Sequence, residues 1–278
     1  MDYKFGLIAK GIKNSVTPLV YEAFGKDLGM NVSFEIFNVE EDKFEETVKF
    51  TRGHLNGFNV TMPYKVRMLD FVDELDESAE RCGSTNVVLV KDGKLIAYNT
   101  DGWGMIKALQ LKGFSFKDKK VVMVGAGGVA LSIAYNLLVN DVAEVSVLNI
   151  FSEEAERLCS RFGEKFTPHP LENSELCRCC EGADFFINAS VLGQLGYDDY
   201  TSFDFLDSLA SGAVVFDVNY SNPNAKLPAA GREKGLHSFV GRSMTACQGI
   251  RAMEIWTGSV PSDTSAKQLV YRFENELK

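Results

Sequence analysis

A predicted strand, a glycine turn and a predicted helix follow one another at Lys120–Ala130 (KVVMVGAGGVA), and this order constrains the fold more than any other feature. The apolar run Val121–Val124 predicts a buried strand, and Leu131–Leu138 predicts the helix. Between them the letters GAGGVA have the spacing G-x-G-x-x-A. Such a turn suits a dinucleotide pyrophosphate, because glycines let the backbone approach the phosphates and the helix N-terminus offers N–H groups. The segment predicts a Rossmann domain, with an ordinary glycine-rich turn as the alternative.

Length and composition leave room for two domains and favour an ordinary globular protein. The 278 residues are 45% hydrophobic and 24% charged. The sequence has no apolar run of the roughly 18 residues that cross a membrane. The N-terminal letters MDYKFGLIAKG lack the apolar core of a signal peptide, and the net charge of −9 argues against nucleic acid as a partner. We expect a cytoplasmic monomer or homodimer whose partners are small molecules, not nucleic acid or membranes.

The cysteines form one cluster in the sequence. Cys177, Cys179 and Cys180 lie close together, and His169 is the nearest histidine. Six cysteines in a chain of this length do not indicate a disulfide framework. A zinc site is one alternative for the cluster, but the expectation is reduced thiols and no bound metal.

Predicted strands and helices alternate along the first hundred residues, which is typical of an α/β protein with a parallel or mixed sheet. Apolar patterns predict strands at Lys4–Ala9, Val32–Val39, Gly57–Thr61, Asn86–Val90 and Leu95–Tyr98. Helical spacing predicts helices at Leu19–Leu28, Glu40–His54 and Trp103–Lys112. In the second of these helices, we expect Phe44, Val48 and Phe50 to face inward. Asp92 and Gly93 between the last two strands are typical of a two-residue hairpin turn.

The alternation continues after the glycine turn. It predicts strands and helices at Glu144–Leu148, Glu153–Phe162, Asp184–Asn188, Ala213–Val218 and Ala229–Lys234. Two last helices, at residues 244–256 and 266–277, come too late for a Rossmann domain, so we assign them to the first domain. The predicted organisation is an N-terminal α/β substrate-binding domain at 1–101, completed by helices within 242–278, and a Rossmann NAD(P)-binding domain at 102–241.

Polar clusters outside the glycine turn occur at strand ends or helix starts, at Asn14–Pro18, Gly57–Lys65, Ser84–Asn86 and Asn99–Gly102. The hydroxyls of Ser15 and Thr17 lie beside a helix start and can bind a carboxylate, with helix capping as the alternative. A strand delivers Asn59 and Thr61 on one side. Lys65 is expected in the first helical turn that follows.

Lys65 and Asp101 are the pair that would carry the chemistry. Each has an ordinary alternative, since a lone lysine is usually solvated and Asp101 can cap the helix behind it. Because both follow predicted strands, we expect them to meet in one cleft. There the ammonium would bind the carboxylate and pass a proton to a carbonyl group that is being reduced by hydride.

Together these motifs resemble those of the shikimate dehydrogenase family, which includes quinate/shikimate dehydrogenases. They occur in order from about Gly6 to Gly258, which is nearly the whole chain. The matching segments are Ser15–Pro18, Gly57–Lys65, Asn86, Asn99–Gly102, Gly125–Gly128, Asn188–Ser190, Asp217–Tyr220 and Met244–Gly249. Any one motif could arise by chance, but the complete set in this order is specific.

The resemblance implies the reversible NAD(P)H-dependent reduction of 3-dehydroshikimate to shikimate, in aromatic amino acid biosynthesis. Lys65 would be the proton donor and acceptor, with Asp101 as its partner, and Ser15 and Thr17 would hold the substrate carboxylate. The implied contacts to the rest of the substrate are Asn59, Thr61, Lys65, Asn86, Asp101, Tyr220 and Gln248. The implied cofactor-binding residues are Gly125, Ala126, Gly127, Gly128, Val129, Asn149, Ser190, Val218 and Gly241.

The chain departs from the family at the expected adenosine end of the cofactor. Family members that use NADP have arginines that clamp the 2′-phosphate, at positions where this chain has Ile150 and Glu154. Leu131 replaces a further common arginine. NADP(H) is the family default, but these absences and the acidic Glu153 and Glu154 favour NAD(H). Glu153 is the acid that we expect to come within reach of the ribose.

Two substitutions keep other functions open. Thr17 stands where shikimate-specific enzymes mostly have serine, and Val87 replaces a common threonine. One alternative is therefore an NAD-dependent quinate/shikimate dehydrogenase. The missing arginines motivate another alternative, a non-catalytic regulatory relative that kept the substrate pocket and lost cofactor affinity.

Overall fold

The computed structural model describes residues 2–12 and 17–275. The expected carboxylate ligand Ser15 therefore lies outside the described residues. Contacts divide the chain into two compact units, Met1–Leu111 with Thr245–Lys278, and Lys112–Met244. The helix α4 (Asp101–Leu111) belongs to the first unit, whereas the division expected from the sequence assigned residues 102–111 to the second.

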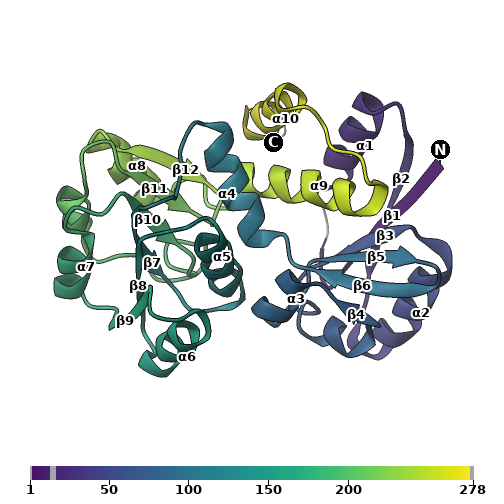
Figure 1. The fold of residues 1–278 in the computed structure, drawn as a ribbon, viewed down its shortest axis with the longest axis horizontal. Helices are drawn as coiled ribbons and strands as arrows, with labels where there is room; N and C mark the ends of the chain where they lie inside the picture. Colours follow the sequence, from purple (N-terminus) through teal and green to yellow (C-terminus); the bar gives the residue numbers. More distant parts are fainter. Residues whose placement is uncertain (1, 13–16, 276–278) are drawn as a thin grey trace. The chain divides into compact units, whose positions relative to one another are not determined.

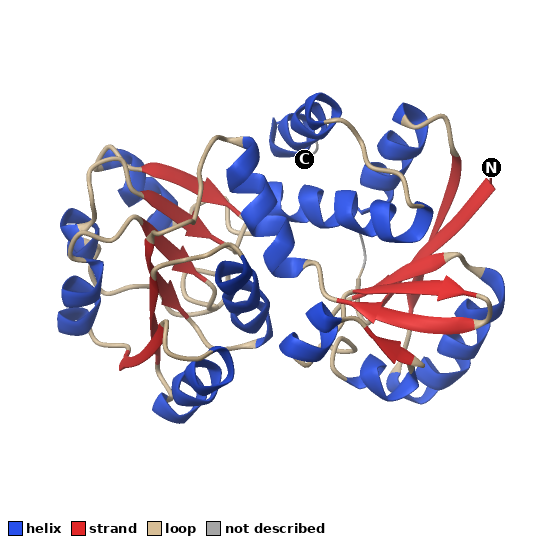
Figure 2. Ribbon diagram, viewed as in Figure 1, coloured by secondary structure: helices blue, strands red, loops and turns tan. Residues whose placement is uncertain are grey.

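The first unit is built on a mixed six-stranded sheet in the order β2-β1-β3-β5-β6-β4 (Figures 1 and 2). β1 lies parallel to both β2 and β3, whereas β5 is antiparallel to β3 and β6. The strands are β1 (Asp2–Ala9), β2 (Asn31–Asn38), β3 (Gly57–Val60), β4 (Glu74–Leu75), β5 (Val87–Lys91) and β6 (Lys94–Tyr98).

The β5–β6 hairpin has the turn that its sequence predicts. Asp92 has φ 52° and Gly93 has φ 75°, so both residues are left-handed, as a two-residue turn of this kind requires. Val87 pairs with Tyr98 in the ladder. The residues just before β5 and just after β6 therefore lie side by side at the open end of the hairpin.

Three short helical segments and α2 (Phe44–His54) complete this part of the unit, namely η1 (Glu41–Lys43), η2 (Arg67–Phe71) and α3 (Glu77–Cys82). Phe44 and Val48 of α2 are buried as predicted, but the prediction that Phe50 is buried is wrong. Phe50 is 43% exposed and stacks on His54. The helix expected to hold Lys65 is also absent, since Lys65 lies in a turn before η2.

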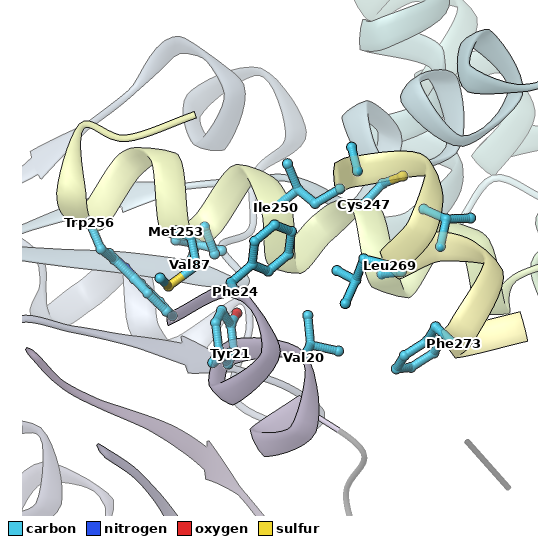
Figure 3. Packing of buried hydrophobic residues seen from close by; sticks show 14 of the residues in the cluster. Val20, Tyr21, Phe24, Val87, Cys247, Ile250, Met253, Trp256, Leu269 and Phe273 are labelled. Carbon is cyan, nitrogen blue, oxygen red and sulfur yellow. The ribbon is translucent and has the colours of Figure 1, made fainter. Parts of the chain in front are cut away.

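The C-terminal helices close the core of the first unit. α9 (Arg242–Thr257, of which residues from Thr245 group with this unit) and α10 (Asp263–Asn275) pack against α1 (Thr17–Asp27) in one apolar cluster (Figure 3). Trp256 donates to the Val88 carbonyl at 2.9 Å. Its indole lies where a Cβ on Gly57 would be, only 2.3 Å from the ring. The glycine that opens the Gly57–Lys65 motif therefore makes room for Trp256.

The second unit has the Rossmann topology. Its six-stranded sheet is parallel throughout, in the order β12-β11-β10-β7-β8-β9, with α5 and α6 on one face and α7 and α8 on the other (Figure 1). The chain adds strands outward from β7 in one direction up to β9 and then in the other direction from β10, so the strand order reverses between β7 and β10, where this fold binds dinucleotides. The strands are β7 (Lys120–Val124), β8 (Glu144–Asn149), β9 (Phe166–Pro170), β10 (Phe185–Asn188), β11 (Val214–Asp217) and β12 (His237–Val240). The helices are α5 (Gly128–Val139), α6 (Ser152–Phe162), α7 (Asn173–Cys180) and α8 (Lys226–Glu233), with η3 (Asp204–Ser208).

Three elements of this unit, β9, β12 and α7, have no clear pattern in the sequence and were not predicted. β9 reads FTPHP, and its two prolines argue against a strand. β9 and β12 are the two edges of the sheet, and proline is tolerated on an edge because half of the backbone groups there need no ladder partner. Both edge strands are short and carry little apolar pattern, so their place in the sheet decides their structure.

Candidate functional site

Lys65 and Asp101 form an ion pair in the first unit. Lys65 Nζ donates to Asp101 Oδ2 at 2.7 Å, and the two side chains are 23% and 4% exposed. The structure thus brings together the two residues that the sequence predicts to pair. An ammonium group has three hydrogens, and this bond uses one of them.

Asn86 fixes the other oxygen of Asp101. Its Nδ2 donates to Asp101 Oδ1 at 2.8 Å and to Thr100 Oγ1 at 3.0 Å. Its Oδ1 accepts from the Thr100 backbone N–H at 2.8 Å. Both amide hydrogens of Asn86 are therefore in use, and the residue positions Asp101 within a buried network.

The β5–β6 hairpin explains why these residues meet. Asn86 precedes β5, and its backbone N–H donates to the Tyr98 carbonyl at 3.2 Å. This bond fixes the position of Asn86 relative to the end of β6. Asn99 follows β6 and accepts from the Asp101 backbone N–H through its side chain at 3.1 Å, while its own amide donates to Ser84. The turn that carries Lys65 is joined to the same hairpin by a bond from the Thr85 N–H to the Lys65 carbonyl at 2.9 Å.

Asn59 lies behind this network. Its Oδ1 accepts from the Tyr21 hydroxyl at 2.6 Å, and its Nδ2 donates to the Asn86 carbonyl at 3.1 Å. The side chain expected to contact substrate is therefore bound on both polar atoms by the protein itself. Thr61, two residues further on, is half-buried and donates its backbone N–H to Ile8.

The remaining expected substrate ligands, Thr17, Gln248 and Tyr220, lie on other elements than the Lys65–Asp101 network. Thr17 is the first residue of α1, although the sequence analysis made it the cap before that helix. Gln248 is half-buried on α9, and its neighbour Gly249 approaches Val20 in the first turn of α1, where a Cβ would lie 2.6 Å from the valine. Tyr220 belongs to the second unit and is 42% exposed.

The glycine turn of the second unit has two kinds of glycine. Gly125 has φ +111°, and a Cβ there would lie 2.6 Å from the Ala189 carbonyl oxygen, so the protein itself requires glycine. Gly127 has φ −76°, and a Cβ on Gly127 or Gly128 would meet nothing within 4 Å. Neither conformation nor packing requires glycine at these two positions, and a bare backbone there fits the close approach of a pyrophosphate.

The start of α5 adds free backbone N–H groups beside the glycine turn. Gly127 is its N-cap and no side chain caps the helix, so the N–H groups of the first turn, Val129 included, have no partner within the helix. Such a helix end attracts anions. Ala126 lies between the glycines and lines an adjoining hollow.

That hollow has a volume of about 270 Å³ and lies beside the end of β8. It is lined by the glycine turn, by Leu131 and by α6, from which Glu154, Arg157 and Arg161 contribute. Asn149 Nδ2 donates to Glu154 Oε2 at 2.9 Å. Glu153, the acid expected to come within reach of the ribose, is exposed and does not line the hollow, whereas Glu154 does. Ile150 is 68% exposed.

The other expected cofactor residues follow neighbouring strands. Ser190 comes after β10, Val218 after β11 and Gly241 after β12, so all three lie at the carboxyl edge of the sheet together with the glycine turn. A Cβ on Gly241 would lie 2.1 Å from the Val218 carbonyl oxygen. Glycine at 241 therefore lets these two loops touch.

The cysteine cluster contributes to one possible metal site within residues 2–12 and 17–275. His169 Nδ1, a Glu175 carboxylate oxygen and Cys179 Sγ lie within 4.8 Å of one another. An Arg178 guanidinium nitrogen already contacts them, at 3.0 Å, 2.7 Å and 3.8 Å respectively. Burial and the guanidinium lower the pKa of His169, and burial raises the pKa of the Cys179 thiol. Arg178 thus provides the cation of this cluster.

Sequence reasoning missed several of these residues. Nothing in the sequence links Tyr21 to Asn59, because the contact depends on how α1 packs on the sheet. Arg157 and Arg161 carry a signal that was overlooked, since they follow Glu154 at helical spacing and so share one face of α6. In the part of the chain that the structure describes, no helix is long and apolar enough to span a membrane.

Comparison with known proteins gives a consistent result. Residues 7–88 match the family model of the shikimate dehydrogenase substrate binding domain, and residues 107–194 match that of shikimate / quinate 5-dehydrogenase. A shikimate dehydrogenase (NADP(+)) of Alkaliphilus metalliredigens is 34% identical over 259 residues, which is 91% of each chain.

The solved structures that this chain resembles include enzymes of the same family. A shikimate 5-dehydrogenase of Listeria monocytogenes in complex with shikimate and NAD is 28% identical, with a TM-score of 0.87 over 97% of this chain and 96% of that one. A shikimate 5-dehydrogenase of Thermus thermophilus in complex with NADP(H) and shikimate is 25% identical, with a TM-score of 0.84 over 98% and 99% of the two chains. The present chain belongs to the shikimate dehydrogenase family.

Proposed function

We propose that this chain catalyses the reversible reduction of 3-dehydroshikimate to shikimate with a nicotinamide cofactor. The observation that carries the proposal is the bond between Lys65 Nζ and the buried Asp101 carboxylate, in the unit that matches the family's substrate-binding domain. The Rossmann unit supplies the second requirement, since its bare glycine backbone and uncapped helix fit a dinucleotide.

Lys65 moves the proton in this mechanism. A nicotinamide cofactor held by the Rossmann unit would supply the hydride for the carbonyl carbon. The Lys65 ammonium donates a proton to the carbonyl oxygen, which becomes the hydroxyl group, and the resulting amine stays on Asp101. Because the Lys65 side chain is 23% exposed, it can recover a proton from water. The same groups act in reverse when shikimate is oxidised.

Asp101 has capacity left for a substrate hydroxyl. A carboxylate offers about four acceptor positions, and Lys65 and Asn86 use one on each oxygen. The amide hydrogens of Asn86 are already committed, so we assign Asn86 and Asn59 to positioning Asp101. Thr61 and Gln248 remain the proposed partners of the ring hydroxyls, with Tyr220 beside the ring and Ser15 and Thr17 on the carboxylate.

Replacing Lys65 tests the proposal. Lys65→Ala should lower kcat by roughly 10²–10⁴-fold, which is the usual contribution of a general acid. Binding of the dinucleotide should stay within twofold. Lys94→Ala is the matched control, since Lys94 is a surface lysine that also pairs with a carboxylate, Glu74, at 2.7 Å. Ordinary turnover by Lys65→Ala would contradict the mechanism, and a wild-type chain without turnover would favour the regulatory alternative.

We further propose NAD(H) as the preferred cofactor. Glu154 is held at the end of β8 by Asn149, and an acid at the end of this strand hydrogen-bonds the ribose 2′-hydroxyl in NAD-binding Rossmann folds. A carboxylate there repels a 2′-phosphate. NADP(H) is the second candidate, supported by Arg157 and Arg161 in the same hollow and by the cofactor of the Alkaliphilus relative.

Initial rates of shikimate oxidation with NAD and NADP, measured side by side, separate the two candidates. Glu154→Gln should lower kcat/KM for NAD about tenfold and raise it for NADP. Arg157→Gln and Arg161→Gln are the matched variants on the same helix face, and they should leave NAD unaffected. A preference for NADP that either arginine variant abolishes would establish the second candidate. Quinate in the same assay tests the quinate/shikimate alternative.

A further inference from the structure

Asp217, the last residue of β11, is a fully buried carboxylate that the proposed mechanism does not use. Its Oδ1 accepts three hydrogen bonds, from Asn188 Nδ2 at 2.9 Å and from the backbone N–H and Nδ2 of Asn219, both at 3.1 Å. Its Oδ2 has no hydrogen-bond partner among the described residues. A buried charge held only by neutral donors is costly, which calls for an explanation.

The donors to Asp217 are the residues that hold the loop after β10. Asn188 Nδ2 also donates to the Leu192 carbonyl at 2.9 Å, and Asn188 Oδ1 accepts from the backbone N–H and hydroxyl of Ser190. Asn219 Nδ2 also donates to the Ser190 carbonyl at 2.9 Å and to the Leu192 carbonyl at 3.3 Å. Every one of these bonds ties residues 189–193 to the two asparagines that Asp217 fixes.

The loop at 189–193 in turn packs directly against the glycine turn. The Ala189 carbonyl lies so close to Gly125 that no side chain fits between them. On its other side, Asp217 is followed directly by Val218, whose carbonyl contacts Gly241. Asp217 is thus linked to the glycine turn through the 189–193 loop, and to the loops expected to contact the nicotinamide through Val218.

We propose that Asp217 is a positioning residue for dinucleotide binding, which holds residues 189–193 against the glycine turn through Asn188 and Asn219. This inference rests on the proposed function in so far as the chain must bind a dinucleotide. Bonds to an ionised acceptor are roughly twice as strong as bonds to a neutral one, so the loop is held most firmly when Asp217 is charged.

The electrostatic surroundings make this support sensitive to pH. Burial raises the pKa of Asp217 from 3.8 to about 6, against the opposing effect of its three hydrogen bonds. The titratable groups that face it are Tyr200 and Asp199, and neither is a cation. Lys226 Nζ lies 3.6 Å from Asp199 Oδ2 and offsets the charge of Asp199. As the pH falls through about 6, Asp217 loses its charge and the loop is held less firmly.

Two substitutions at Asp217 separate its shape from its charge. Asp217→Asn keeps an oxygen for the three donors but cannot titrate, whereas Asp217→Ala removes the acceptor. The dissociation constant of NADH or NADPH, whichever binds more tightly, is measured by nucleotide fluorescence between pH 5 and 8. Amide hydrogen exchange at residues 189–193 is measured without nucleotide.

For Asp217→Ala we expect the dissociation constant to rise at least tenfold and exchange at 189–193 to accelerate at least tenfold. The KM for shikimate should change less than twofold. Asp217→Asn should bind within threefold of wild type at pH 8 and lose the wild-type weakening at pH 5. If Asp217→Ala does not fold, Asn219→Ala, which removes two of the bonds to the loop, should show a smaller rise with the same faster exchange.

Unchanged exchange at 189–193 in Asp217→Ala, or nucleotide binding equal to wild type, would overturn the inference. A wild-type pH dependence that persists in Asp217→Asn would also overturn it. Each of these results leaves the proposed function intact, because that function depends on Lys65 turnover. A wild-type chain that binds neither nucleotide would refute the proposed function together with this inference.

Discussion

Two buried aspartates, one in each unit, show how differently a carboxylate can be used. Asp101 is 3% exposed and Asp217 is fully buried, and each accepts a hydrogen bond from an asparagine amide. Asp101 also holds an ammonium group at 2.7 Å, whereas Asp217 is surrounded by neutral donors. The ammonium group beside Asp101 makes the pair that we propose to transfer the proton. Without a cation beside it, the Asp217 carboxylate organises backbone and its charge becomes responsive to pH.

The largest expected effect comes from removing the first aspartate. Asp101→Ala should reduce kcat roughly 100- to 1000-fold, about 3–4 kcal/mol in activation free energy, because Lys65 loses the group that orients it. Steady-state kinetics measure this effect, and nucleotide affinity should be unchanged. Glu74→Ala, which removes the partner of Lys94, is the control and should leave kcat unaffected. A loss below tenfold would mean that Lys65 is oriented by something else.

The second aspartate should act on stability instead. Global unfolding returns Asp217 to water and so relieves the cost of burying its charge, whereas the loosening of one loop around a still-buried Asp217 does not. Because burial raises the pKa of Asp217 in the folded chain to about 6, from its ordinary 3.8, its contribution to stability is complete below pH 3.8 and is lost as the pH rises from 3.8 through 6. Between pH 4 and 8, the unfolding free energy of Asp217→Asn should therefore rise by about 2–3 kcal/mol relative to wild type. Guanidinium unfolding at both pH values measures this difference. A constant difference would show that Asp217 has an ordinary pKa.

Substitutions of Gly125 and Gly127 in the glycine turn form a matched pair, and we expect effects of intermediate size from them. Gly125→Ala should cost about 1–3 kcal/mol of stability through backbone strain alone, besides the clash with Ala189. Gly127→Ala should leave stability within about 0.5 kcal/mol and weaken nucleotide binding about tenfold. Thermal unfolding and fluorescence titration measure both quantities. Equal behaviour of the two variants would refute the distinction between structural and ligand-facing glycines.

The smallest expected effect comes from Tyr21, which is connected to Asp101 through Asn59 and Asn86. Tyr21→Phe removes the hydroxyl that binds Asn59 and keeps the buried ring. We expect a loss of about 1 kcal/mol in stability and a change in kcat of no more than threefold. Tyr64→Phe is the control, since that hydroxyl donates to the Val39 carbonyl away from Asn59. A drop in kcat of tenfold or more for Tyr21→Phe alone would make the Tyr21–Asn59 bond part of the catalytic support.

Local sequence determined the elements that depend on local physics. The glycine turn, the hairpin at Asp92 and Gly93, and the buried strand Val121–Val124 each satisfy a requirement that neighbouring residues impose. The pairing of Lys65 with Asp101 was also predictable, because both residues follow strands of one sheet.

What could not be predicted depends on contacts between distant segments. Phe50 was expected to face inward with Phe44 and Val48, but its ring lies beside Phe37 and His54 and the residue is 43% exposed. The choice between Glu153 and Glu154 depended on how α6 is rotated about its axis. The oligomeric state, the cytoplasmic location and the roles of Ser15, Thr17 and Tyr220 stay predictions.

The packing of Trp256 over Gly57 has a consequence for how the chain folds during synthesis. The ribosome must finish the whole intervening Rossmann unit, Lys112–Met244, before the indole emerges to cover the first sheet. The nucleotide-binding unit is contiguous in sequence and can fold as it leaves the ribosome. The segment that carries Lys65 and Asp101, although translated first, gains its complete core last.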